Sequence, residues 1–192
     1  WVYCRFEMST PTKIMTVVGA RPQFIKAATV SRAVQSRDDV EEVLVHTGQH
    51  YDANMSDTFF EELAIPAPGH HLGIGSGPHG AQTGAMLEAI EQVMLEERPN
   101  WLLVYGDTNS TIAGALAAAK IHVPVAHVEA GMRSFNRRMP EEINRVVTDH
   151  LATINFTSTG TATSHLSSEG IDGDRVLEVG DVMFDAARFY GE

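Results

Sequence analysis

The chain has 192 residues, 43% of them hydrophobic, and a formal net charge of −11 at pH 7, which predicts one acidic domain with a sizeable core and argues against nucleic acid and anionic membranes as partners. Its apolar runs are all shorter than the roughly 18 residues that span a membrane, and residues 1–8 lack the basic and apolar pattern of a signal peptide. The single cysteine, Cys4, excludes an intramolecular disulfide and favours a cytoplasmic protein.

Strand and helix signals alternate along the chain. In chain order, we expect a strand at 14–19, a helix at 22–37, a strand at 42–46, a helix at 55–63, a loop at 64–78, a helix at 81–97, a strand at 101–105 and an alanine-rich helix at 111–120. The pattern continues with a strand at 123–129, a helix at 140–151, a strand at 154–157, a helix at 162–170, a strand at 175–179 and a helix at 182–190. Strands separated by helices of this length indicate parallel βαβ units, so we expect an α/β fold with a Rossmann-like parallel sheet and helices on both faces.

The same pattern suggests how the chain divides into parts. Residues 1–12 precede the first strand and are interpreted as an N-terminal extension, and residues 13–181 as the Rossmann-like domain. A fresh helical pattern follows Gly180-Asp181, so residues 182–192 are interpreted as the start of an interdomain segment. A second domain is therefore expected beyond this sequence.

Polar and charged side chains follow four of the predicted strands. The carboxyl ends of parallel strands meet at one edge of a sheet, where open α/β folds bind their ligands. The residues delivered there are Arg21 with Lys26 one turn further on, Gln49 and His50, Asp107 and Thr108, and Glu129 with Arg133. A sheet does not need these polar and charged side chains for its stability, so their expected convergence at one edge predicts a ligand-binding site.

The cations and the acids of this edge suggest different roles. Arg21 and Lys26 flank a helix N-terminus, which favours an anion such as phosphate, although arginines at helix starts are often only surface residues. Asp107 and Glu129 come from neighbouring strands, where two acids can have their pKa values pushed apart, as proton transfer at carbon requires. Alternatively, Asp107, Asn109 or Ser110 could cap the helix that follows.

The stretch after the fourth of these strands joins a basic loop, residues 132–139, to a helix that begins with Glu141 and Glu142. The loop arginines could be solvated, and both acids could simply complement the helix dipole. Nine histidines occur, but none forms an HxxxH or HExxH pattern on a predicted helix, so no metal site is expected. The GxSxG elbow of serine hydrolases and the GxxxxGK[ST] phosphate loop are also missing from the sequence.

Five motifs together resemble the non-hydrolysing UDP-N-acetylglucosamine 2-epimerases. In chain order they are Gly19-Ala20-Arg21-Pro22-Gln23 with Lys26, Thr47-Gly48-Gln49-His50 with Met55, Tyr105-Gly106-Asp107-Thr108, His127-Val128-Glu129-Ala130-Gly131 with Arg133, and Pro140-Glu141-Glu142-Ile143-Asn144-Arg145. Four segments resemble most closely the branch that epimerises UDP-2,3-diacetamido-2,3-dideoxy-glucuronic acid for surface polysaccharides. They are residues 19–26, 52–55, 107–111 and 180–183.

The resemblance implies a fold, a reaction and a set of roles. It implies the N-terminal half of a two-domain GT-B type fold, with the active site between the halves, and a homodimer when the chain is complete. The reaction implied is an anti elimination of UDP from a UDP-sugar, then its re-addition with inverted C2, without any cofactor. Catalytic roles are implied for Asp107, Glu129 and Glu141, and substrate binding for Arg21, Lys26, Gln49, His50, Thr108, Arg133 and Arg145.

Two alternatives to this isomerase remain open. One is a hydrolysing relative that releases UDP and the free epimerised sugar. The other is a non-catalytic half-domain that only binds a nucleotide sugar. If the chain is part of the isomerase, we expect the isolated chain to be inactive, because the second half of the cleft is missing.

Overall fold

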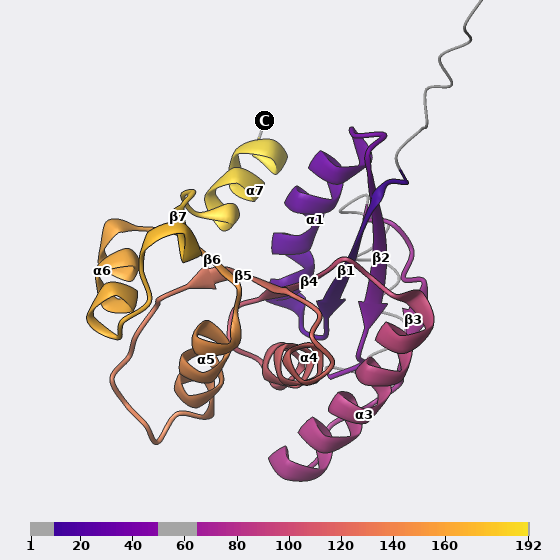
Figure 1. Cartoon of the computed structure of the whole chain (residues 1–192), viewed down its shortest axis with the longest axis horizontal. Helices are drawn as coiled ribbons and strands as arrows, with labels where there is room; N and C mark the ends of the chain where they lie inside the picture. Colours follow the sequence, from indigo (N-terminus) through magenta and orange to yellow (C-terminus); the bar gives the residue numbers. More distant parts are fainter. Residues whose placement is uncertain (1–9, 50–64, 192) are drawn as a thin grey trace, which may run out of the picture.

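The computed structural model describes residues 10–49 and 65–191, which build one seven-stranded, wholly parallel sheet (Figure 1). The strand order is β3-β2-β1-β4-β5-β6-β7, with each pair in parallel register. The strands are β1 (Thr12–Val18), β2 (Val40–His46), β3 (His70–His71), β4 (Trp101–Tyr105), β5 (Val125–Ala130), β6 (Ile154–Thr157) and β7 (Val176–Glu178). The order runs outward in both directions from β1 and β4, and this arrangement confirms the predicted Rossmann-like sheet.

Helices cover both faces of the sheet, as predicted. They are α1 (Arg21–Gln35), α3 (His79–Glu97), α4 (Asn109–Lys120), α5 (Pro140–Leu151), α6 (Gly160–Ser168) and α7 (Val182–Tyr190), with a short 3₁₀ turn at Gly173–Arg175. In Figure 1, α1 and α7 lie together on one face, and α3, α4 and α5 lie on the other. Because the strands are buried on both faces, they read in the sequence as continuous apolar runs.

The side-chain alternation of the strands divides the core into two layers. Met15 and Val17 of β1 and Leu102 of β4 pack toward α3 and α4, whereas Val18 and Leu103 pack toward α1. The alanine-rich helix α4 lies close to the sheet because its buried positions carry small residues: Ala113, Ala115, Ala117 and Ala118 are all fully buried.

Differences from the expected elements have local causes. The predicted loop at 64–78 is wrong at His70–His71, which pair with β2 as a two-residue edge strand too short to produce a pattern. Helix α4 begins at Asn109 rather than 111, because the Thr108 hydroxyl accepts a hydrogen bond from the Thr111 amide at 3.3 Å. Capping by Asp107, Asn109 or Ser110 is thus wrong. The helix expected at 55–63 lies outside the described residues.

The backbone of Gly131 lies very close to that of α6, and this contact leads to a testable prediction about stability. Gly131 follows β5 with φ of +77°, and an added Cβ would lie 2.4 Å from the carbonyl oxygen of Ala162 in α6. Replacing Gly131 by Ala should therefore lower the free energy of unfolding by more than about 2 kcal/mol, because strain and a backbone clash add. Urea denaturation measures this. The matched Gly84→Ala change, on α3 with open space around it, should instead stabilise by up to about 1 kcal/mol; similar effects at both positions would contradict the clash.

Candidate active site

The carboxyl ends of β1, β4 and β5 bring the two predicted acids together with two cations. Lys26 on α1 forms an ion pair with Glu129 at the end of β5. Arg145 on α5 forms an ion pair with Asp107, which follows β4. The side chains of Glu129 and Asp107 keep exposed fractions of 29% and 27%, so both carboxylates remain reachable from solvent. The edge of the sheet therefore carries two neighbouring carboxylates, each held by a cation from a different helix.

Glu129 has an unusual backbone conformation. Its φ is +70°, and the pairing of β5 with β6 shifts register between Val128 and Ala130. A glutamate in the left-handed region costs free energy, and residues held this way cluster at functional sites. The resulting bulge interrupts the strand alternation at this residue. This feature was not predictable from the sequence, because nothing in the residue pattern of β5 marks a register shift against β6.

Asp107 is fixed through both its side chain and its backbone. Its carboxylate pairs with Arg145, and its carbonyl oxygen accepts a hydrogen bond from the Asn144 side chain at 2.9 Å. Arg145 also lies 3.2 Å from the Glu142 carboxylate. In the described structure Arg145 therefore pairs with both Asp107 and Glu142.

The two glutamates that begin α5 have different environments. Glu142 is buried and its carboxylate accepts hydrogen bonds from the Ser134 amide and hydroxyl and from the Phe135 amide. Burial raises the pKa of Glu142, but these bonds and the charge of Arg145 outweigh burial and lower it overall. Glu141 is exposed, so its catalytic role stays a prediction. Through these hydrogen bonds Glu142 joins the basic loop to the first turn of α5. The sequence had suggested only that Glu142 complements the helix dipole.

The structure places three further predicted substrate-binding residues, Gln49, Thr108 and Arg21, near this edge. Gln49 accepts hydrogen bonds from the amide and hydroxyl of Ser110, at 3.1 and 2.8 Å. Thr108 caps α4, and Arg21 is the exposed first residue of α1. His50 lies outside the described residues. Substrate contacts by any of these residues stay predictions.

Gln23 is a site residue that sequence reasoning did not single out. Its side chain is 1% exposed. Its carbonyl accepts from the amides of Gly19 and Ala20 at 2.8 and 3.1 Å, while its amide donates to the Tyr105 carbonyl at 2.8 Å. Gln23 therefore joins the turn after β1 to the turn after β4. Its position on the buried face of an amphipathic helix was the available signal, because a polar residue there must find partners.

Arg133 is buried in an ion-pair network rather than solvated, so that interpretation is wrong. Its side chain is 1% exposed and lies 2.6 Å from Asp149 and 2.7 Å from Glu169. Asp149 also accepts from His127 at 2.7 Å and from the Gly131 amide at 3.1 Å. The predicted contact of Arg133 with substrate stays a prediction. The loop therefore owes part of its shape to a buried aspartate that no motif indicated.

The lowered pKa of the buried Asp149 carboxyl leads us to expect that the free energy of unfolding depends on pH. Burial raises its pKa, but the hydrogen bonds and charges of His127 and Arg133 outweigh burial and lower it below the ordinary value. A lowered folded-state pKa gives stability that is present above the unfolded value of about 4 and is lost as pH falls through the folded value. Asp149→Asn should cost about 3–5 kcal/mol at neutral pH, because Arg133 loses its buried partner.

Urea denaturation at several pH values checks this prediction. The difference between wild type and the Asp149→Asn variant should shrink as the pH falls from neutral toward strongly acidic. Asp174→Asn, at an exposed position, should change stability by less than about 0.5 kcal/mol. A pH-independent difference between wild type and the Asp149 variant would contradict the assignment of charge to Asp149.

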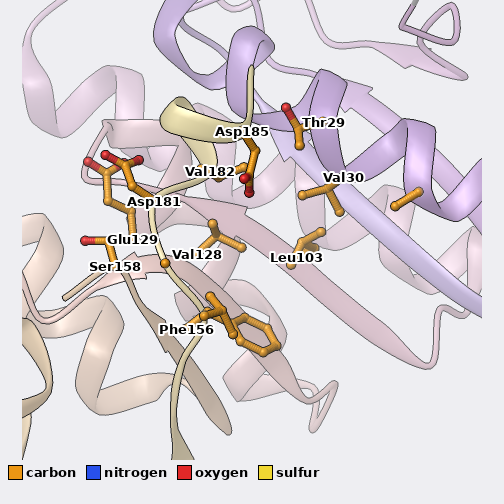
Figure 2. Close-up of a pocket in the computed structure, with 13 residues that line it drawn as sticks. Thr29, Val30, Leu103, Val128, Glu129, Phe156, Ser158, Asp181, Val182 and Asp185 are labelled. Carbon is orange, nitrogen blue, oxygen red and sulfur yellow. The ribbon is translucent and has the colours of Figure 1, made fainter. Parts of the chain in front are cut away.

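A pocket of about 310 Å³ opens beside Glu129, between α1, α7 and the sheet (Figure 2). Figure 2 shows an apolar floor that includes Leu103, Val128 and Phe156, with Glu129 and Asp181 at one side. The Asp181 side chain caps α7 by accepting from the Met183 amide at 2.8 Å. The described lining includes no lysine or arginine, so the pocket suits an apolar or hydroxyl-bearing group better than a phosphate.

Over residues 10–49 and 65–191, no group of three or more His, Cys, Asp and Glu side chains could hold a metal ion. In the same part of the chain, no helix is both long and apolar enough to cross a membrane.

Comparisons with known proteins identify relatives. The family model described as UDP-N-acetylglucosamine 2-epimerase matches residues 32–192. The chain is 56% identical over 182 residues to the UDP-2,3-diacetamido-2,3-dideoxy-D-glucuronate 2-epimerase of Pseudomonas aeruginosa, covering 94% of this chain and 51% of that protein. It is 59% identical over 174 residues to a UDP-N-acetylglucosamine 2-epimerase homolog of Methanococcus maripaludis, covering 91% and 48%.

Solved structures of UDP-GlcNAc 2-epimerases also match this chain. The UDP-GlcNAc 2-epimerase of Methanocaldococcus jannaschii, in complex with UDP-GlcNAc and UDP, superimposes with a TM-score of 0.90 at 47% identity, covering 93% of this chain and 49% of that one. This likeness confirms the predicted fold class, one Rossmann-like half of a GT-B type fold. The chain spans about half the length of the relatives it matches. It belongs to the UDP-N-acetylglucosamine 2-epimerase family.

Proposed function

We propose that this chain forms one half of a non-hydrolysing UDP-sugar 2-epimerase. The observation that carries the proposal is the pair of carboxylates, Asp107 and Glu129, at the ends of neighbouring parallel strands, each paired with a cation. The relatives are about twice as long, so the activity is proposed for a protein that contains both halves, called the complete protein below.

The charges at this edge suit an elimination. A carboxylate takes the C2 proton, the electrons of that C–H bond form the C1–C2 double bond, and the C1–O bond breaks to release UDP as an anion. Re-addition of UDP to C1, with a proton returned to C2 on the opposite face, gives the epimer. A C2–H with no adjacent carbonyl is weakly acidic, so stabilisation of the leaving diphosphate must lower much of the barrier.

Lys26 supplies a cation suited to that leaving group. It lies one turn into α1, whose N-terminus also favours an anion, and its side chain is 10% exposed. Two acids near one carbon allow one to remove the proton and the other to return it.

The sugar is proposed from the relatives. The Pseudomonas aeruginosa relative is named for a diacetamido-glucuronate and the Methanocaldococcus jannaschii structure for UDP-GlcNAc. A uronate would need a cation for its C6 carboxylate, for which the exposed Arg137 and Arg138 are candidates. The homodimer implied by the resemblance and the cytoplasmic location favoured by the single cysteine stay predictions.

Isotope exchange tests the proposal. The complete protein, incubated in deuterium oxide with each UDP-sugar, should incorporate deuterium at C2 and release traces of UDP. Product analysis separates the alternatives: stoichiometric UDP and free sugar would indicate a hydrolysing enzyme, and binding without exchange or release would indicate a non-catalytic module. Either result would overturn the proposed reaction.

A further inference from the structure

The centre of β5 carries a buried histidine that the proposed reaction does not use directly. His127 is 0% exposed. Its Nδ1 lies 2.7 Å from the Asp149 carboxylate, and its Nε2 lies 2.7 Å from the carbonyl oxygen of Gly106. One ring therefore connects β5 to α5 on one side and to the turn after β4 on the other.

Both neighbours of the ring are hydrogen-bond acceptors. A backbone carbonyl such as that of Gly106 can only accept. Asp149 also accepts from Arg133 at 2.6 Å and from the Gly131 amide at 3.1 Å, as an ionised carboxylate does. Each ring nitrogen of His127 must therefore donate a proton, and a ring with two N–H groups is an imidazolium.

The surrounding charges agree with this state. The network around the ring contains Asp149, Arg133 and Glu169, and the exposed His150 lies 3.9 Å from Glu169. Two carboxylates and one guanidinium leave a net charge of −1, which the imidazolium of His127 neutralises. Buried charges are tolerated when they are paired and hydrogen-bonded in this way.

The carbonyl that His127 holds belongs to a residue in contact with the candidate site. Gly106 has φ of +63° and directly precedes Asp107. A Cβ placed on Gly106 would lie 3.4 Å from Lys26 Nζ and 3.8 Å from Glu129 Oε2. The Gly106 amide donates to the Val128 carbonyl at 3.0 Å. Because the Gly106 amide and the Gly106 carbonyl are both bonded to β5, the two peptide groups that flank Gly106 have little freedom to rotate.

We propose that His127 is a positioning residue, an imidazolium that fixes the Gly106 carbonyl and so sets Asp107 beside the Lys26–Glu129 pair. The inference rests on the proposed function and deepens it. A neutral ring would present an unprotonated nitrogen to an acceptor at one of its two sides, which would free either Gly106 or the α5 contact. The turn after β4 would then lose the bond that orients it.

Two measurements on the complete protein test the inference. The first is a proton–nitrogen correlation spectrum of the wild type with isotopically labelled histidine. Both ring nitrogens of His127 should show the shift of protonated nitrogen, whereas a neutral ring gives one protonated and one widely separated unprotonated signal. The second is kinetics of His127→Asn, whose side chain can reach only one of the two partners. We expect turnover to fall by about 10²-fold, as for a misplaced catalytic group, with little change in KM.

The matched control is His122→Asn, at an exposed histidine with φ of +64° that asparagine accommodates. It should keep wild-type turnover. An unprotonated ring nitrogen in wild-type His127, or wild-type turnover in a folded His127→Asn variant, would overturn the proposal. If that variant does not fold, the wild-type spectrum alone decides. A complete protein without C2 exchange but with a doubly protonated His127 would overturn the proposed function and leave the state of the ring intact.

Discussion

Replacing Asp107 by Asn, or Glu129 by Gln, is expected to lower deuterium incorporation at C2 by about 10²–10⁴-fold, the usual contribution of a general acid or base. Each change keeps the side-chain shape and removes the group that can accept a proton. Because each carboxylate also pairs with a cation, Arg145 or Lys26, the amides should weaken those pairs without leaving a large cavity.

The measurement is isotope exchange in the complete protein, followed by nuclear magnetic resonance of the C2 position. UDP release should fall in parallel, since the same C–H bond must break before either product forms. The control is Asp174→Asn, which removes an exposed acid on the 3₁₀ turn and should leave exchange unchanged. Exchange that survives both site substitutions would show that neither acid handles the C2 proton.

Replacing Gln23 by Ala should lower the free energy of unfolding by about 3–5 kcal/mol. The change leaves the buried amides of Gly19 and Ala20 without their acceptor, at about 1–3 kcal/mol each, and it also opens a cavity. The Tyr105 carbonyl keeps its bond from the Thr111 hydroxyl at 2.7 Å, so it adds less.

Urea denaturation measures this effect, and the same helix provides the control. Gln35, the exposed last residue of α1, should tolerate Ala within about 0.5 kcal/mol. A loss below about 1 kcal/mol for Gln23→Ala would mean that water replaces the side chain as the partner of the two amides.

The candidate site was only partly predictable from strand ends. Asp107 and Glu129 lie where parallel topology puts them, because the carboxyl ends of neighbouring strands must meet. Their cationic partners were not predictable, since the pair Lys26–Glu129 joins residues 103 positions apart. For Arg133 the sequence suggested a place at the ligand edge and left a solvated loop charge as the alternative, because nothing local marks Asp149 as its buried partner.

The sequence by itself determined the class of fold and the family. Apolar runs alternating with amphipathic helices specify a parallel sheet covered on both faces, because local periodicity depends only on which side chains must be buried. The motifs that carry the resemblance are also short and local, so they could be read without a structure.

Tertiary structure alone decided the conformation and partners of the site residues. The left-handed backbone of Glu129, the two-residue strand β3, and the contacts of His127 with Gly106 and Asp149 all arise between elements far apart in the chain. Such contacts depend on how β4, β5 and α5 pack against one another, and no periodicity within a single element encodes that packing.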